Sequence, residues 1–266
     1  MLPVVLLTGV CHTTAGQWIS SGSRATAMGI SGVMLTGESA GGINQASLAT
    51  HERPSCFLHC ANRFLIPELS FGAFCLSLPA KPGTFAFSGA CSGTAAFHEI
   101  QAGVLFGRSL GKFVRAGVGM HYLRMDSYTF RQSRQTVVPS FGVQVIAGKS
   151  LSMGMLIFNP AGMQYAPSSP RIIPVLFGAG IGYHADDNLL ICLEYFKETN
   201  QKPLLSGGME YLLHKLVTLR FGVAGGQYPR FSFGIGLQLS AIKADLSVVR
   251  HPLLGSSPAI SLSGTL

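Results

Sequence analysis

The most regular feature of the sequence is an alternation of large apolar side chains with small or uncharged polar ones. Residues 231–239 read FSFGIGLQL, in which every second residue is bulky and apolar and the residues between are Ser, Gly or Gln. An alternation of period two over such a length predicts a β-strand whose two faces differ chemically. Residues 177–183 and 216–225 repeat this pattern.

Segments of this kind recur from about residue 53 to the end of the chain, with turn-forming residues between them. Segments of about ten residues joined by short turns are typical of transmembrane β-barrels. An even number of strands also allows a sheet to close with antiparallel neighbours. Fourteen strands are predicted, at residues 55–63, 67–78, 84–93, 98–108, 113–124, 136–147, 150–158, 172–184, 188–197, 203–213, 216–225, 230–240, 242–251 and 258–265.

The two faces keep their character from one predicted strand to the next. In residues 113–124, Val118 and Met120 alternate with Gly117 and Gly119. Charged residues almost always lie on the face of small residues, and a charge on a lipid-facing side would cost about 2–4 kcal/mol near the bilayer midplane. We therefore expect the bulky face to contact lipid and the other face to line the barrel interior.

Composition separates this prediction from a water-soluble β-sandwich, the main structural alternative. Hydrophobic residues make up 47% of the chain and charged residues only 11%, well below the roughly 25% charged residues of soluble domains. The mean hydropathy is +0.38, yet outside the N-terminus no run reaches the roughly 20 apolar residues of a spanning helix. The predicted fold class is therefore all-β, a transmembrane antiparallel β-barrel of about 14 strands with an N-terminal plug segment.

The charges and motifs exclude several function classes. The net charge of +8 comes from cations dispersed singly along the chain, which favours contact with lipid head groups over nucleic-acid binding. The sequence lacks HExxH, a P-loop and a Rossmann fingerprint, and its six cysteines have no metal-ligand spacing. We predict no enzyme activity, no catalytic residue, no metal and no cofactor, and expect most cysteines to act as small apolar residues.

Three parts are predicted along the chain. Residues 1–15 resemble a degenerate secretion signal with a short apolar stretch, residues 16–52 are expected to form a plug, and residues 53–266 form the barrel. Within the plug, residues 22–50 are rich in Gly, Ser and Ala without clean alternation. Strand glycines permit close approach of another backbone, so a folded segment inside the lumen is expected. The alternative is a disordered linker.

The predicted register brings charged residues together inside the barrel. Glu194, Glu210 and Arg220 lie on three consecutive predicted strands, all on the inward face, and Lys243 and Asp245 face inward two strands further on. Buried charges are tolerated when they are paired, so we predict an interior ion-pair network in which Arg220 contacts Glu210. Such a network could hold the plug or steer a ligand, or it could simply fill the lumen. Arg115, on the small-residue face of residues 113–124, is assigned to the same lumenal set.

Residues 22–49, GSRATAMGISGVMLTGESAGGINQASLA, resemble the N-terminal signature of the PorV/PorQ-like outer-membrane proteins within the FadL-like barrel group. The matching positions include Arg24 and the plug motif Asn44, Gln45, Ala46 and Ser47, where Ser47 replaces the usual Gly. Further similarity lies at residues 158–160, 171–174 and 251–258. Residues 38–42 and the terminal Leu266 depart from the family pattern.

The resemblance implies a fourteen-stranded barrel in the cell outer membrane, in contact with outer-membrane lipid. It also implies a non-enzymatic accessory role in type IX-like protein secretion, with secretion-machinery or exported proteins as partners bound through the loops and the plug. The alternative is a passive FadL-like transporter of small hydrophobic molecules. Residues 126–135, DSYTFRQSRQ, form the most polar and aromatic predicted loop and are expected on the outer surface. Large ordered loops over a filled lumen would favour partner binding, and a hydrophobic pocket beside the plug or a lateral gap in the wall would favour transport.

Overall fold

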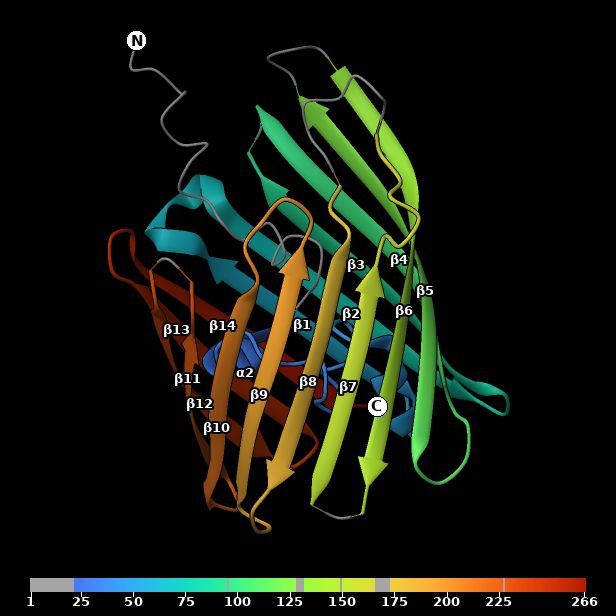
Figure 1. Cartoon of the computed structure of the whole chain (residues 1–266), viewed down its shortest axis with the longest axis vertical. Coiled ribbons are helices and arrows are strands. Elements are labelled where there is room, and N and C mark those ends of the chain that lie inside the picture. The colour runs from blue at the N-terminus through green and yellow to red at the C-terminus, as the bar shows by residue number, and fades with distance from the viewer. Residues whose placement is uncertain (1–21, 95, 128–131, 149, 166–172, 227) are drawn as a thin grey trace.

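Fourteen antiparallel strands close into a single barrel, as the alternating pattern predicts (Figure 1). The computed structural model describes residues 22–94, 96–127, 132–148, 150–165, 173–226 and 228–266. Each strand pairs with its neighbours in sequence, and the barrel closes where β1 (Ser55–Asn62) pairs with β14 (Gly255–Thr265). The other strands are β2 (Ser70–Ala80), β3 (Gly83–Gly93), β4 (Phe97–Ser109), β5 (Val114–Ser127), β6 (Gln132–Ala147), β7 (Leu151–Phe158), β8 (Leu176–His184), β9 (Leu189–Glu198), β10 (Leu204–His214), β11 (Val217–Ala224), β12 (Arg230–Leu239) and β13 (Ile242–His251).

The two ends of the barrel differ in the length of their connections. At one end, which we call the short-turn end, the strands are joined by tight turns such as residues 81–82, 215–216 and 240–241. The opposite end, the loop end, carries longer connections, including residues 159–175, and lies at the top of Figure 1. In outer-membrane barrels short turns face the periplasm and long loops face outward. We therefore assign the short-turn end to the periplasmic side and the loop end to the outer side.

The strand boundaries differ from the predicted ones where proline or long pairing decides them. The predicted strand 67–78 begins only at Ser70, because Pro67 starts a short 3₁₀ turn, η4 (Pro67–Leu69), after η3 (Arg63–Leu65). Pro174 likewise delays β8, since proline cannot donate to a strand ladder. Conversely, β5 and β6 extend through most of the predicted loop 126–135, with Asp126 opposite Ser133, and rise above the rest of the wall (Figure 1).

The outer wall of the barrel is apolar. Phe231, Phe233 and Ile235 are 46%, 51% and 48% exposed, and no second sheet covers them among the described residues. The rings of Phe221 and Phe233 contact each other across β11 and β12 at 5.2 Å. Such a surface is stable in hydrocarbon, so the barrel is an outer-membrane protein. No helix in the described parts of the chain is long and apolar enough to cross a membrane.

Residues 22–51, which precede β1, lie inside the barrel. The helix α2 (Gly22–Ala27) contacts β11 to β14, and the 3₁₀ helix η2 (Gln45–Thr50) contacts β3 to β6 (Figure 1). We call residues 22–51 the lumenal segment; nearly all of its side chains are buried or half-buried. The predicted secretion signal, and residues 16–21 of the predicted plug, lie outside the described residues.

Candidate functional site

Glycines on the inner face of the wall allow the lumenal segment to touch the strands directly. A Cβ added to Gly208 on β10 would lie 2.5 Å from Met28 Cβ and 2.6 Å from Met28 O. A Cβ at Gly117 on β5 would lie 2.5 Å from the backbone nitrogen of Ala46. Glycine is uncommon inside strands because it weakens them. Here the inward glycines leave room for a second backbone against the wall, which their alternation predicts.

A chain of four alternating charges joins the lumenal segment to the wall. Arg220 Nε lies 2.6 Å from Glu210 Oε2, which is the predicted contact, and Arg220 Nη1 lies 2.6 Å from Asp245 Oδ1. Arg24 of α2 completes the chain, with Nε and Nη2 donating to the two oxygens of Glu210 at 2.8 and 2.7 Å. Arg24 Nη1 also donates to Thr36 O. Two cations and two carboxylates thus neutralise one another inside the barrel.

Glu194 is inward-facing as predicted, but its partner is backbone and not a cation. Its Oε2 accepts hydrogen bonds from the amides of Gly32 and Val33 at 2.7 and 2.9 Å. On the other side of this turn, Gln144 of β6 donates to Val33 O and Leu35 O. The turn at residues 32–35 is therefore held between β6 and β9 by side chains that satisfy its backbone.

The motif residues Asn44 to Ser47 lie at the start of η2 and are all buried. Asn44 caps η2 by accepting from the Ala46 amide, and its Nδ2 donates to Val33 O at 2.8 Å. The same nitrogen lies 3.3 Å from Val143 O and from Met155 O on the wall. Asn44 therefore connects two parts of the lumenal segment with β6 and β7.

The other two predicted lumenal charges behave differently from each other. Lys243 contacts Glu38 of the lumenal segment at 3.0 Å and is not part of the Arg220 chain. Arg115 stands apart from the predicted network: none of the described residues pairs with it, and its Nη1 is buried without a hydrogen-bond partner. Arg24 was not among the predicted members of the network. The available signal was that Arg24 is the only cation in residues 22–50 and therefore needed a partner inside the lumen.

At the short-turn end a buried histidine holds the end of the lumenal segment. His51 Nδ1 lies 2.7 Å from Ser77 Oγ, and Ser77 Oγ lies 2.6 Å from Ser55 Oγ. His51 Nε2 lies 3.2 Å from Gly37 O. Burial lowers the pKa of His51 below its ordinary value, so the ring is neutral at neutral pH.

Toward the loop end, part of the inward face of the wall is apolar, on β5, β6 and β8, although Glu99 and Glu198 are also buried there. Leu123, Val138 and Leu176 are completely buried inside the lumen. They belong to one contiguous cluster that begins at Tyr165 and Ile173 of the 159–175 loop and ends at the short-turn side of β9. Its remaining members are Ala25, Met28, Val33, Met34, Leu35, Ala40, Ile43, Met125, Leu156, Phe158, Leu190 and Cys192. The lumen therefore contains an apolar stretch beside the polar and charged side chains of the inner wall.

A cavity of about 200 Å³ lies where this cluster reaches the short-turn end. Met34, Leu35 and Leu190 belong both to the cluster and to the cavity wall. Arg24 and Arg115 supply its charged lining. Thr36, Ser152 and His184 also line it, so the cavity has apolar, polar and cationic residues around it.

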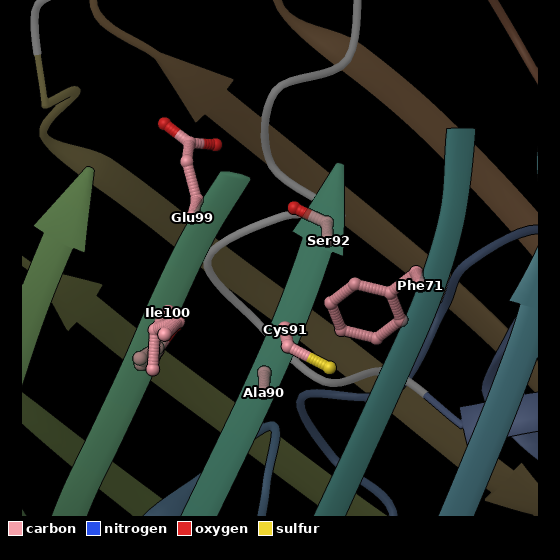
Figure 2. Close-up of a pocket in the computed structure, with 7 residues that line it drawn as sticks. Phe71, Ala90, Cys91, Ser92, Glu99 and Ile100 are labelled. Carbon is pink, nitrogen blue, oxygen red and sulfur yellow. The ribbon is translucent and has the colours of Figure 1, made fainter. Parts of the chain in front are cut away.

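A second hollow lies at the wall of β2 to β4, where Figure 2 shows Phe71, Cys91 and Glu99 around it. Its volume of about 10 Å³ is that of a single water site. Cys91 remains in register with Gly72 on one side and with Ile100 on the other. The hollow is therefore not a lateral gap in the wall.

The described residues contain no cluster of three or more His, Cys, Asp or Glu side chains that could hold a metal ion. Their five cysteines are free thiols. Cys56, Cys60 and Cys91 face outward, and Cys75 and Cys192 are buried in the inner wall.

No protein-family model and no curated protein matches the sequence. Solved structures with the same fold do match. A FadL homologue from Pseudomonas aeruginosa is 12% identical, with a TM-score of 0.65 over 92% of this chain and 98% of that one. The toluene transporter TodX from Pseudomonas putida is 9% identical, with a TM-score of 0.70 over 91% and 96%. The toluene transporter TbuX from Ralstonia pickettii is also 9% identical, with a TM-score of 0.64 over 92% and 98%.

These likenesses show that the chain has the fold of the FadL-like barrels. They do not bear on the PorV/PorQ resemblance or on secretion, which stay predictions. TodX and TbuX are described as toluene transporters, and a TodX variant as a monoaromatic hydrocarbon channel.

Proposed function

We propose that the protein is a passive outer-membrane transporter of small hydrophobic molecules, with residues 22–51 as its plug. The observation that carries the proposal is the contiguous apolar cluster that runs through the lumen from the 159–175 loop to the cavity at the short-turn end. An apolar molecule is poorly soluble in a polar pore and needs an apolar lining along its route. The descriptions of TodX and TbuX as toluene transporters support the same ligand class.

In this proposal the plug is displaced when a molecule passes. The cluster is closely packed, since its members are at most 8% exposed. A molecule must therefore separate the lumenal segment from the wall along β6 to β9. The hydrogen bonds of Glu194 and Gln144 to residues 32–35 set how readily this separation occurs.

A reversible disulfide lock tests the proposal. Ser31 Oγ of the lumenal segment lies 2.9 Å from Ser206 Oγ on β10, so cysteines at both positions are close enough to bond with small adjustments. Cys192 interacts with Ser31 and is replaced by Ala so that it cannot compete. We expect cells with Ser31→Cys/Ser206→Cys/Cys192→Ala to take up radiolabelled toluene only after reduction.

The matched control is Ser31→Cys/Cys192→Ala, which cannot form this lock and should take up toluene in both redox states. Heat-modifiable migration on a detergent gel confirms that each barrel is folded. Equal toluene uptake by the oxidised and the reduced lock variant would show that the plug does not have to move for transport. Wild-type uptake no faster than that of cells without the protein would overturn the transport function itself.

The accessory role in secretion is the second candidate, and the filled lumen is the observation that favours it. Against it, the loop-end connections at residues 199–203 and 252–254 are short and offer little surface to a partner. Crosslinking in native membranes, followed by mass spectrometry of attached proteins, tests this role. Specific capture of exported proteins by the wild-type chain would favour it over transport.

A further inference from the structure

We propose that the cavity at the short-turn end binds a small aromatic carboxylate, with Arg115 as the residue that pairs with the carboxylate. The inference names a substrate class for the proposed transporter and rests on that function for its biological role. The binding itself follows from the cavity.

The first step is the state of Arg115. Arg115 lines the cavity, its Nη1 is buried without a hydrogen-bond partner, and none of the described residues pairs with it. A buried donor without a partner is unfavourable, and more so when it is charged. An arginine held in this way has a donor to offer to an incoming anion.

The charges around the cavity do not balance. Arg24, the other arginine of the lining, is already satisfied by Glu210 and Thr36. Glu210 is shared with Arg220, which also binds Asp245. None of the described residues that line the cavity is acidic. The positive charge of Arg115 is therefore the uncompensated one, and an anion would neutralise it.

The third step is the chemistry of the remaining wall. Apolar side chains from the lumenal segment and from two strands line it together with the polar residues Thr36, Ser152 and His184. The apolar ones are Met34, Leu35, Ile146 and Leu190. A free inorganic anion would gain nothing from these side chains, whereas an aromatic ring would bury its surface against them.

The volume of the cavity is large enough for one aromatic ring. The cavity holds about 200 Å³, compared with the roughly 150 Å³ of an engineered apolar cavity in another protein that accepts benzene. One ring with a carboxylate fits this volume. Arginine pairs with a carboxylate through two parallel, charge-assisted hydrogen bonds, which orients the ring toward the apolar side chains.

The experiment uses the full-length protein in an uncharged detergent, with 4-fluorobenzoate as the probe and fluorine NMR as the readout. The neutral ring 4-fluorobenzyl alcohol and inorganic phosphate are the comparison ligands. We expect 4-fluorobenzoate to bind at least tenfold more tightly than the alcohol, because a hydrogen bond between two charged groups is stronger than one to a neutral hydroxyl. Phosphate should not displace it at comparable concentration.

Arg115→Gln should lose at least tenfold in affinity for 4-fluorobenzoate while leaving the weak binding of the alcohol unchanged. Arg108→Gln is the matched control, because Arg108 is an exposed, outward-facing arginine near the same end of the barrel. Equal affinity for the acid and the alcohol in the wild type overturns the proposal even if Arg115→Gln does not fold. So does undiminished binding by a folded Arg115→Gln, or displacement by phosphate.

The outcomes are separable from those of the proposed function. If the lock variant shows redox-dependent toluene uptake but 4-fluorobenzoate does not bind, the transport function is supported and the carboxylate site is rejected. Carboxylate binding without toluene uptake above background would keep the site and remove the transport role as proposed.

Discussion

Replacing Gly208 by Ala should loosen the lumenal segment without disturbing the barrel wall. The new Cβ would lie 2.5 Å from Met28 Cβ and 2.7 Å from Met28 Cα, whereas carbon atoms in contact are separated by about 3.5–4.0 Å. Met28 must therefore move by roughly 1 Å. Overpacking of this kind costs about 1–3 kcal/mol, which corresponds to roughly 5- to 150-fold in the equilibrium for local opening.

Gly72→Ala on β2 is the matched control, since a Cβ there has only Cys91 Sγ as a close neighbour, at an ordinary 3.6 Å. Both changes remove the flexibility of a strand glycine, so their difference isolates the clash with Met28. The assay is hydrogen exchange with mass spectrometry in detergent. Peptides that cover residues 22–35 should exchange faster in Gly208→Ala, while peptides from β1 to β5 remain unchanged. Identical exchange in the two variants would refute the direct packing of the segment on the inward glycines.

Three further predictions concern the polar contacts of the lumen. Arg220→Leu leaves Asp245 buried without its cation and should lower the free energy of unfolding by about 3–5 kcal/mol. Its melting temperature should therefore be lower than that of the exposed control Lys215→Leu. Equal melting temperatures would contradict the ion-pair chain. Glu194→Leu should speed the exchange of the Gly32 amide tenfold or more, whereas Glu194→Gln, which keeps an acceptor, should have a smaller effect; indistinguishable rates would argue against the anchoring. Because the folded-state pKa of His51 is lowered by burial, its contribution to stability is complete above about pH 6.5 and is lost as the pH falls below that value. His51→Gln should flatten this part of the curve of melting temperature against pH, and an unaltered slope would show that another group is responsible.

Much of the barrel could be predicted because strand alternation is a local property of the chain. Because side chains alternate between the two faces of a strand, the sequence indicates which residues face lipid, and turn residues mark where each strand ends. The contact between Arg220 and Glu210 could also be predicted, because both residues face inward on adjacent strands. The predicted boundaries moved where Pro67 and Pro174 interrupt pairing, and where β5 and β6 continue to pair beyond the predicted turn.

The candidate site could be predicted only in part, because the lumenal segment has no period from which its path follows. Glu194 was correctly assigned to the inner face, but its partners are amides of a turn whose position depends on the whole barrel. Arg24 joins Glu210 across 186 positions of the chain, a separation at which no spacing rule operates. The isolation of Arg115 is likewise a property of the assembled lumen.

The sequence by itself determined a closed sheet with an apolar exterior, since hydrocarbon selects side chains strand by strand. It also determined that the inner face was small enough to admit another segment. Only the tertiary structure decided which inward side chains meet that segment, where the apolar cluster ends and that a cavity with an unpaired arginine remains. These depend on contacts between residues far apart in the chain, which form only when the curvature of the closed barrel brings the strands around the segment.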